Sequence, residues 1–467
     1  MKYRNLVFEG GGVKGIAYVG ALEYLISISL KEGGRPIDLN EIQRVAGTSA
    51  GAIAALLVSL NYSVDDIRKK FEELDFRDFA DKVNIFEWAF SRFIKGEHYL
   101  YKGEKVLEWI QKRIEEKLGK KSVTFQELKE GGGKDLYIVG TNLSQQRIDI
   151  FSQEHTPNMP IDVAVRTSMA IPFVFKGVNF SIENGIYNHN GTEVYVDGGV
   201  MCNYPIEIFD NIDYIMDAEY RKRVTLESLC SLRTASMFPR ELSTRSFVKP
   251  KLIEPGLYRF VNAETLGLKV DSKEEIKLYS DNFAKKVNEG TYKKEASRQQ
   301  ISSLFGYTKS LISLFYNSQD LIRGKTENLR TIYIYSKEIS TTDFSLKEVE
   351  KSALIKNGRE GCENFTATYS IKIKERKEMN KVKVKELDDD FVEQYFSEIR
   401  ETIRTLSADD VISLSSSSQV PLFFRALCQD EGESGPKRRT REEAEVDLSE
   451  HTGHKDKIVR SCSPPLG

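Results

Sequence analysis

One pentapeptide of this chain has the residue types and spacing of an activated serine. Residues 47–51 read Gly-Thr-Ser-Ala-Gly, and a Gly-x-Ser-x-Gly pattern places its serine on a sharp strand-to-helix turn with the hydroxyl pointing out of the fold. Glycines are needed because this turn brings the backbones of strand and helix close together. Ser49 would then stand at a helix N-terminus, where N–H groups and the helix dipole favour a developing negative charge. The alternative for the pentapeptide alone is a tight turn with a surface serine.

A glycine-rich turn earlier in the chain offers a place for the negative charge of an acyl-transfer intermediate. Residues 10–15 read Gly-Gly-Gly-Val-Lys-Gly and lie between an expected strand and an expected helix. Glycines leave backbone N–H groups unobstructed, so that they can point at an oxyanion. The same residues also match the G-x-G-x-x-G fingerprint of a nucleotide-binding oxidoreductase. That alternative needs an acidic residue after the second strand, where this chain has residues 47–49, Gly-Thr-Ser.

An aspartate at the end of a later strand is the candidate base for the serine. Asp197 follows an expected strand at 194–196 and precedes two glycines that leave space beside its carboxylate. A Ser-Asp-His triad in this chain order needs a histidine after the aspartate. The histidines lie either in the expected tail or earlier, in segments without a supporting motif: His451 and His454, and His98, His155 and His189. We therefore expect a Ser49–Asp197 dyad, with Asp197 accepting the serine proton directly or through water.

The elements that must position these residues predict an α/β architecture. Apolar strand-like runs alternate with helical patterns over about the first 215 residues, which is typical of a sheet layered with helices. The expected strands are 6–8, 44–46, 136–139, 148–151, 194–196 and 214–216. The expected helices are 15–30, 50–60, 64–74, 103–118 and one that opens at Pro160.

The chain changes character after about residue 220. Residues 218–410 are more charged and lack the alternation, while 303–314 and 391–406 have helical apolar spacing. We expect a mostly helical region there. Residues 411–467 contain a run of serines and a basic cluster, and predict a disordered tail. The expected division is therefore a domain at 1–217, a helical region at 218–410 and a tail at 411–467.

Taken in order, the motifs resemble those of the patatin-like phospholipases, over about residues 5–217. The glycine run, the serine pentapeptide and Asp197-Gly198-Gly199 match the family's oxyanion, nucleophile and Asp-Gly-Gly/Ala motifs. The connecting stretches at 124–128, 140–143, 166–172 and 203–205 are similar to those of bacterial-type members. The resemblance implies a three-layer α/β/α domain and calcium-independent hydrolysis of lipid acyl esters, of phospholipase A or lysophospholipase type, without a metal or cofactor.

The resemblance also implies roles for individual residues. Ser49 is the nucleophile and Asp197 the base, and the backbone N–H groups of Gly11 and Gly12, with Gly10, form the oxyanion hole. Lys14 stands where the family has Lys or Arg. The residues that support the motifs are Lys14, Gly15, Gly47, Gly51, Gly198 and Gly199.

Composition limits the partners of such an enzyme. The 467 residues are 40% hydrophobic and 30% charged, with a formal net charge of −2, so no general attraction to nucleic acid or anionic membrane is expected. No apolar run is long enough to span a bilayer, and residues 1–5 lead directly into a strand, so no signal peptide is expected. Five scattered cysteines predict free thiols in a reducing compartment. These features predict a cytoplasmic protein.

Such a protein would meet its lipid peripherally, at a membrane or micelle surface. Residues 86–95 and 304–315 are candidates for contact with lipid, although a core helix is the alternative for both. Residues 171–175 include the end of the family's Ser-Met-Ala-Ile-Pro motif, and the resemblance implies that they line the acyl pocket. The large region after 217 also motivates a second hypothesis, in which the chain is a lipid-binding module, or one regulated by an activator protein, with that region as receptor or gate.

Overall fold

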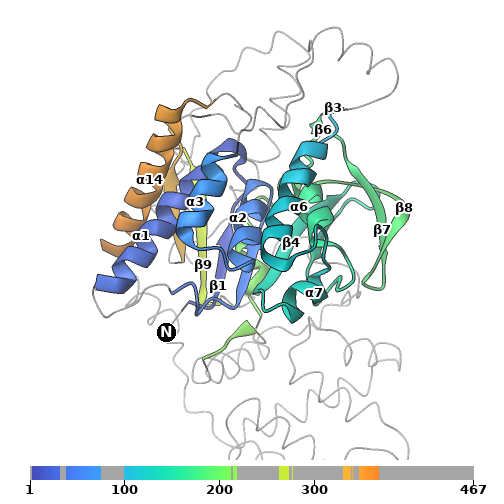
Figure 1. The fold of residues 1–467 in the computed structure, drawn as a ribbon, viewed down its shortest axis with the longest axis horizontal. Helices are drawn as coiled ribbons and strands as arrows, with labels where there is room; N and C mark the ends of the chain where they lie inside the picture. Colours follow the sequence, from blue (N-terminus) through green and yellow to red (C-terminus); the bar gives the residue numbers. More distant parts are fainter. Residues whose placement is uncertain are drawn as a thin grey trace, which may run out of the picture. The chain divides into compact units, whose positions relative to one another are not determined.

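The computed structural model describes residues 3–31, 38–74, 99–211, 214–217, 262–272, 276, 330–337, 339 and 346–367. Strands and helices alternate along its N-terminal half and build a mixed sheet covered by helices (Figure 1). This confirms the expected α/β class. The described helices are η1 (Gly12–Ile16), α1 (Ala17–Lys31), α2 (Ala50–Ser59), α3 (Val64–Glu72), α6 (Glu104–Leu118), α7 (Phe125–Glu130), α8 (Ile161–Ser168), η2 (Gly198–Val200), η3 (Ile206–Phe209) and α14 (Glu348–Ala367).

The main sheet has eight strands, hydrogen-bonded in the order β10-β9-β1-β2-β4-β8-β7, with β5 also paired to β4. Its central strands are parallel, whereas β5, β8 and β7 are joined by antiparallel pairing. The strands are β1 (Asn5–Phe8), β2 (Arg44–Gly47), β4 (Asp135–Asn142), β5 (Arg147–Phe151), β7 (Val178–Glu183), β8 (Ile186–Asp197), β9 (Thr265–Asp271) and β10 (Thr331–Tyr335). A separate pair is formed by β3 (Tyr99–Tyr101) and β6 (Phe173–Phe175).

The register of β4 brings two distant chain segments to one point. Its residue Ile138 pairs with β2 and with β5, so these two strands lie on opposite edges of β4. Gly140 pairs with β5 and with Asp197 of β8, so β8 lies on the same edge as β2. The C-terminal ends of β2 and β8 therefore face each other along β4. Their last paired positions are two residues apart, which is roughly 7 Å of strand.

The sheet continues past the expected domain boundary at residue 217. Strand β9 pairs in parallel with β1, and β10 pairs in parallel with β9. Helix α14 packs beside α1 (Figure 1), in contact so close that a Cβ on Gly20 would lie 1.8 Å from the carbonyl oxygen of Ile355. Two strands of this sheet thus fall within 218–410, where a mostly helical region was expected. The polar residues Lys269 and Asp271 interrupt the apolar pattern of β9, although every residue of that strand is buried.

Most of the other expected elements are confirmed. Helix α2 begins directly after Ser49 and is buried along its whole length, and α8 begins directly after Pro160. The expected strand at 214–216 is wrong, because the described residues 214–217 contain none. Of its three apolar residues Ile215 is buried, whereas Met216 is 48% exposed, and the ring of Tyr214 lies 5.6 Å from that of Phe209.

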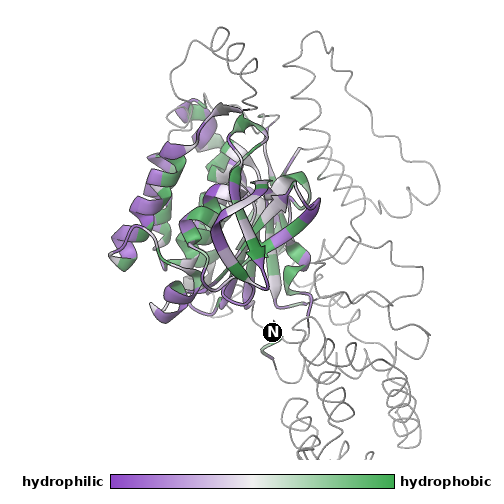
Figure 2. Ribbon diagram, turned by 90° about the vertical axis from the view of Figure 1, so that its right-hand side faces the viewer, coloured by the Kyte–Doolittle hydropathy of each residue, from purple (hydrophilic) through white to green (hydrophobic). Residues whose placement is uncertain are grey.

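Apolar and polar residues separate as layered packing requires. Figure 2 shows hydrophobic residues concentrated where helices meet the sheet, while the outer helices alternate hydrophilic and hydrophobic residues along their length. The strongly amphipathic α3 buries Val64, Ile67 and Phe71, the spacing that places side chains on one helical face. Among the described helices, none is both long and apolar enough to cross a bilayer.

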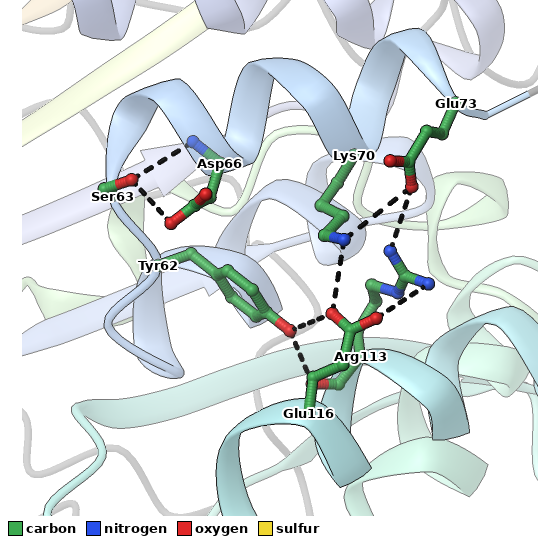
Figure 3. Close-up of polar contacts among 7 residues, drawn as sticks. All are labelled: Tyr62, Ser63, Asp66, Lys70, Glu73, Arg113 and Glu116. Carbon is green, nitrogen blue, oxygen red and sulfur yellow. Dashed lines mark hydrogen bonds and ion pairs between the residues drawn. The ribbon is translucent and has the colours of Figure 1, made fainter.

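Helices α3 and α6 are joined by a cluster of charged residues (Figure 3). The guanidinium of Arg113, with a side chain only 2% exposed, lies 3.2 Å from Glu73 and 3.1 Å from Glu116. The Tyr62 hydroxyl donates a 2.8 Å hydrogen bond to Glu116. Burial opposes the charged form of Glu116, but the Tyr62 hydroxyl and the positive charges of Arg113 and Lys70 lower the pKa of its carboxyl below the usual range. One buried cation is thereby held between two carboxylates.

Candidate active site

Ser49 occupies a strained turn between β2 and α2. It is the N-cap of α2, with φ 53° and ψ −126°, a region that residues with a side chain adopt rarely and at a cost in free energy. The flanking glycines make the turn sterically feasible. A Cβ on Gly47 would lie 2.2 Å from the carbonyl oxygen of Gly51, and one on Gly51 would lie 2.5 Å from that of Phe8. The turn expected from the pentapeptide is therefore present.

The carboxylate of Asp197 meets the hydroxyl of Ser49. The hydroxyl donates a 2.7 Å hydrogen bond to Oδ2 of Asp197, and the two residues are 1% and 0% exposed. The other carboxylate oxygen, Oδ1, accepts a 2.7 Å hydrogen bond from the N–H of Gly199. The structure thus brings these two predicted residues together and fixes the orientation of the carboxylate from both sides.

The C-terminal end of α8 and the residues that follow it hold the backbone of both residues. The N–H of Ser49 donates a 2.9 Å hydrogen bond to Oγ of Ser168, and the N–H of Asp197 donates a 2.9 Å hydrogen bond to the carbonyl oxygen of Ala170. Sequence reasoning missed both contacts. The one available signal was the stretch 166–172, which carried the family resemblance without a role.

The glycine-rich turn passes directly beside Ser49. A Cβ on Gly10 would lie 3.1 Å from Cβ of Ser49 and 2.3 Å from Oδ1 of Asn203. Asn203 makes two hydrogen bonds with the backbone of Gly10. Its backbone carbonyl oxygen accepts a 2.9 Å hydrogen bond from the Gly10 N–H, and its side-chain Nδ2 donates a 3.0 Å hydrogen bond to the Gly10 carbonyl oxygen. Asn203, also missed by sequence reasoning, thus ties this turn to the loop that follows Asp197.

The N–H groups of Gly11 and Gly12 stay the predicted donors to an oxyanion, and their positions in η1 are compatible with that role. Gly11 is the N-cap of η1 and Gly12 its first residue, positions whose N–H groups have no acceptor within a helix. Gly12 also has a φ of 54°, which favours glycine. The N–H of Gly10, expected to contribute as well, is instead bonded to Asn203.

The remaining motif residues shape the packing around the site. A Cβ on Gly15 would lie 3.1 Å from that of Ala50, and one on Gly198 would lie 2.3 Å from the carbonyl oxygen of Val139. These glycines allow η1 to approach α2 and the Asp197 turn to approach β4. Lys14 is half-buried in η1, and its N–H donates a 3.1 Å hydrogen bond to the carbonyl oxygen of Gly11.

The described histidines lie away from this pair. His155 follows β5, on the edge of β4 opposite to β2 and β8, and its Nδ1 is 2.7 Å from Oγ of Ser152. Burial lowers the pKa of its imidazole. His189 is exposed in the part of β8 that pairs with β7. Across the described ranges, no group of three or more His, Cys, Asp and Glu side chains has an arrangement suited to a metal ion.

Several expected features lie outside the described residues: His98, His451, His454, the lipid-contact candidates at 86–95 and 304–315, and the tail at 411–467. The expected acyl-pocket segment at 171–175 is described. Its Phe173 is 51% exposed with φ 67°, whereas Phe175 is buried. Its contact with an acyl chain stays a prediction.

Comparison with known proteins gives a consistent result for the N-terminal half. A family model described as patatin-like phospholipase matches residues 6–210. Among curated proteins, uncharacterized protein R571 of Acanthamoeba polyphaga mimivirus is 35% identical over 209 residues, 44% of this chain and 62% of that protein. Probable lipid hydrolase 463L of Invertebrate iridescent virus 6 is 31% identical over 206 residues, 44% of this chain and 63% of that protein. Protein YqhO of Bacillus subtilis (strain 168), also uncharacterized, is 32% identical over 219 residues, covering 44% of this chain and 67% of its own length.

The match therefore spans between 62% and 67% of the length of these three relatives.

Among solved structures, VipD from Legionella pneumophila aligns with 99% of this chain and 89% of its own, at a TM-score of 0.41 and 15% identity. The type III effector protein ExoU aligns with 98% of this chain and 78% of its own, at a TM-score of 0.33 and 13% identity. The family model covers the glycine run, the serine turn and Asp197 together, and with the curated relatives it shows that the chain belongs to the patatin-like phospholipase family.

Proposed function

We propose that this chain is a serine acyl hydrolase that cleaves fatty-acyl esters of phospholipids or related lipids with Ser49 as nucleophile and Asp197 as base. The observation that carries the proposal is the 2.7 Å hydrogen bond between the Ser49 hydroxyl, on its strained turn, and the buried Asp197 carboxylate. Family membership and the similarity to a probable lipid hydrolase support a lipid ester as the substrate.

The acylation step follows from the positions of these groups. Oδ2 of Asp197 accepts the hydroxyl proton as Oγ of Ser49 attacks the acyl carbonyl carbon. The negative charge then moves to the carbonyl oxygen, where the N–H groups of Gly11 and Gly12 and the N-terminus of α2 stabilise it. Collapse of the intermediate breaks the ester bond, and the leaving alcohol takes the proton from Asp197.

Deacylation repeats the same steps with water. Asp197 accepts a proton from the water that attacks the acyl–Ser49 ester, and the proton then returns to Oγ as the fatty acid leaves. The hydrogen bond from the Gly199 N–H to Oδ1 keeps Oδ2 directed at the serine throughout. One carboxylate thereby serves as base and acid in turn.

The test is release of fatty acid from mixed micelles of phosphatidylcholine and detergent. Ser49→Ala should lower turnover by about 10³-fold or more, because a nucleophile and its base act as a unit. Ser59→Ala is the matched control, since Ser59 is a buried serine of the same helix whose hydroxyl bonds to the Leu56 carbonyl, 2.8 Å away. Wild-type turnover in Ser49→Ala would refute the proposal.

A second candidate is a lipid-binding or partner-regulated module with little catalysis of its own. The burial of Ser49, which is 1% exposed, favours it, because a substrate reaches such a hydroxyl only after the site opens. A fluorophosphonate probe separates the two candidates. Ser49-dependent labelling of the purified protein supports the enzyme, labelling only with added vesicles or cell extract supports regulation, and no labelling under either condition supports a binding module.

A further inference from the structure

A second buried charge cluster lies next to the glycine-rich turn. The ammonium of Lys269 is 3.1 Å from Oε1 of Glu9 and also contacts the carboxylate of Asp271. Lys269 is 1% exposed, and the two acidic residues are buried as well. Burying a charge is costly unless it is paired and hydrogen-bonded, so the geometry of these three side chains is tightly constrained.

The cluster is built where β1 ends beside β9, which continues to Asp271. Phe8 pairs with Leu268, which places Glu9 level with Lys269. The Glu9 N–H donates a 3.1 Å hydrogen bond to the Leu268 carbonyl, and its Oε2 accepts a 2.9 Å hydrogen bond from the Val270 N–H. The Glu9 carboxylate is therefore seated on β9 by an ion pair and a backbone hydrogen bond.

Glu9 passes this constraint to the glycine-rich turn. Glu9 directly precedes Gly10, and its Oε1 accepts a 3.3 Å hydrogen bond from Nδ2 of Asn203. Asn203 is also the residue that makes two hydrogen bonds with the backbone of Gly10. Its carbonyl oxygen accepts a 2.6 Å hydrogen bond from the Tyr18 hydroxyl. The start of the turn is thus fixed through one carboxylate and one carboxamide.

We infer that Lys269 is a positioning residue of the hydrolytic site, acting through Glu9 and Asn203 on the N–H groups of Gly11 and Gly12. The inference rests on the proposed function. Without the ammonium, the buried carboxylates of Glu9 and Asp271 repel each other. The Glu9 carboxylate then moves away from β9, and the start of the glycine-rich turn moves with it. Lys269 lies outside residues 6–210, the part that the family model matches, so the working site includes β9.

The consequence for catalysis is specific. Oxyanion donors act only when they lie about 2.7–3.1 Å from the charged oxygen, and the loss of one such donor typically lowers kcat by about 10²-fold or more. In this inference Lys269 acts through its ion pairs with Glu9 and Asp271, and not by contact with the reacting atoms or the acyl chain. Its loss should therefore reduce kcat and leave KM almost unchanged, which a general loss of folded protein would not do once active sites are counted.

The experiment compares Lys269→Met with Arg113→Met in the full chain. Arg113 is the matched control, because it is an equally buried cation between two carboxylates, in the α3–α6 cluster (Figure 3). Turnover of phosphatidylcholine in mixed micelles is divided by the number of sites that a fluorophosphonate titrates. Lys269→Met should lose at least about 10-fold in kcat with KM within about two-fold, while Arg113→Met keeps its kcat per site. Equal kcat for wild type and Lys269→Met, or equal losses in both variants, would overturn the inference.

Glu9→Gln keeps the test decisive if Lys269→Met does not fold, because it removes the ion pair with little change in size. It should also lower kcat per site, and the double variant should be no slower than the slower single variant, since Lys269 acts through Glu9. An unchanged kcat in Glu9→Gln, or multiplied losses in the double variant, would contradict that route. Wild-type protein without Ser49-dependent turnover would remove the proposed function and this inference together, whereas normal turnover in wild type and variants removes the inference alone.

Discussion

The hydroxyl of Ser49 donates a 2.7 Å hydrogen bond to the carboxylate of Asp197, although 148 residues separate them in the chain. The contact follows from the pairing of β4. Strands β2 and β8 run along the same edge of β4 in opposite directions, and their C-terminal ends face each other. The serine leaves the end of one strand and the aspartate closes the end of the other. The candidate dyad is therefore fixed by the register of the sheet.

Replacing Ser168 by Ala should slow the proposed ester hydrolysis at the chemical step. The substitution leaves the buried N–H of Ser49 without the acceptor that lies 2.9 Å away, which costs about 1–3 kcal/mol and loosens the serine turn. We expect kcat to fall by about 10-fold with KM nearly constant, because the substitution weakens stabilisation of the transition state more than binding of the substrate. Thr167→Val is the control, since the Thr167 hydroxyl bonds to the Val163 carbonyl inside α8. A wild-type kcat in Ser168→Ala would show that this hydrogen bond has no part in positioning Ser49.

Gly51→Ala should destabilise the fold, whereas Gly11→Ala should be tolerated. A Cβ on Gly51 would lie 2.5 Å from the carbonyl oxygens of both Phe8 and Glu9, whereas one on Gly11 would meet nothing closer than 3.6 Å. Because backbone atoms must move in the first case, we expect a loss of about 3 kcal/mol in the free energy of unfolding. The loss for Gly11→Ala should be below about 1 kcal/mol. Urea unfolding of both variants measures the difference, and equal stabilities would contradict the close approach of α2 to β1.

His155 should make the fold less stable in mild acid. Burial lowers the pKa of its imidazole below the ordinary value of 6.5, so the unfolded chain takes up a proton at a higher pH than the folded chain does. The stability is fully present above about pH 6.5 and is lost as the pH falls toward the lower folded pKa, by at most about 1.4 kcal/mol per pH unit.

The matching measurement is the Tm at pH 7.5 and 5.5. His155→Gln should show a smaller decrease in Tm between these values than wild type, and the exposed His189→Gln should match wild type. An identical decrease in all three proteins would mean that His155 does not contribute to the acid sensitivity.

The sequence predicted the parts of the site that local chain geometry encodes. The turn at Ser49 requires glycines at 47 and 51, and the steric contacts of the folded chain show why. Asp197 was recognisable because it ends a strand and is followed by glycines, one of which closely approaches β4. Strands β1 and β4 and the buried helix α2 left equally clear apolar patterns, since each is buried over most of its length.

The parts that escaped prediction depend on partners far away in the chain. The pattern of β9 is interrupted by Lys269 and Asp271, which are tolerated in a buried strand because Lys269 pairs with Glu9 from β1. A hydroxyl at 168 and a carboxamide at 203 have no local feature that reveals what they bind. Their roles appear only when α8 and the loop after Asp197 are placed beside the serine turn.

The most direct measurement is the reaction with a fluorophosphonate. It identifies the residue that is labelled and shows whether the labelling rate depends on Asp197. Wild-type protein should be labelled, and digestion with peptide mass analysis should place the adduct on Ser49. Asp197→Asn should slow the labelling by about 10³-fold or more while its Tm shows that it remains folded, because the hydroxyl then has no carboxylate to accept its proton. Labelling at another serine, or an Asp197→Asn variant that reacts at the wild-type rate, would contradict the Ser49–Asp197 dyad.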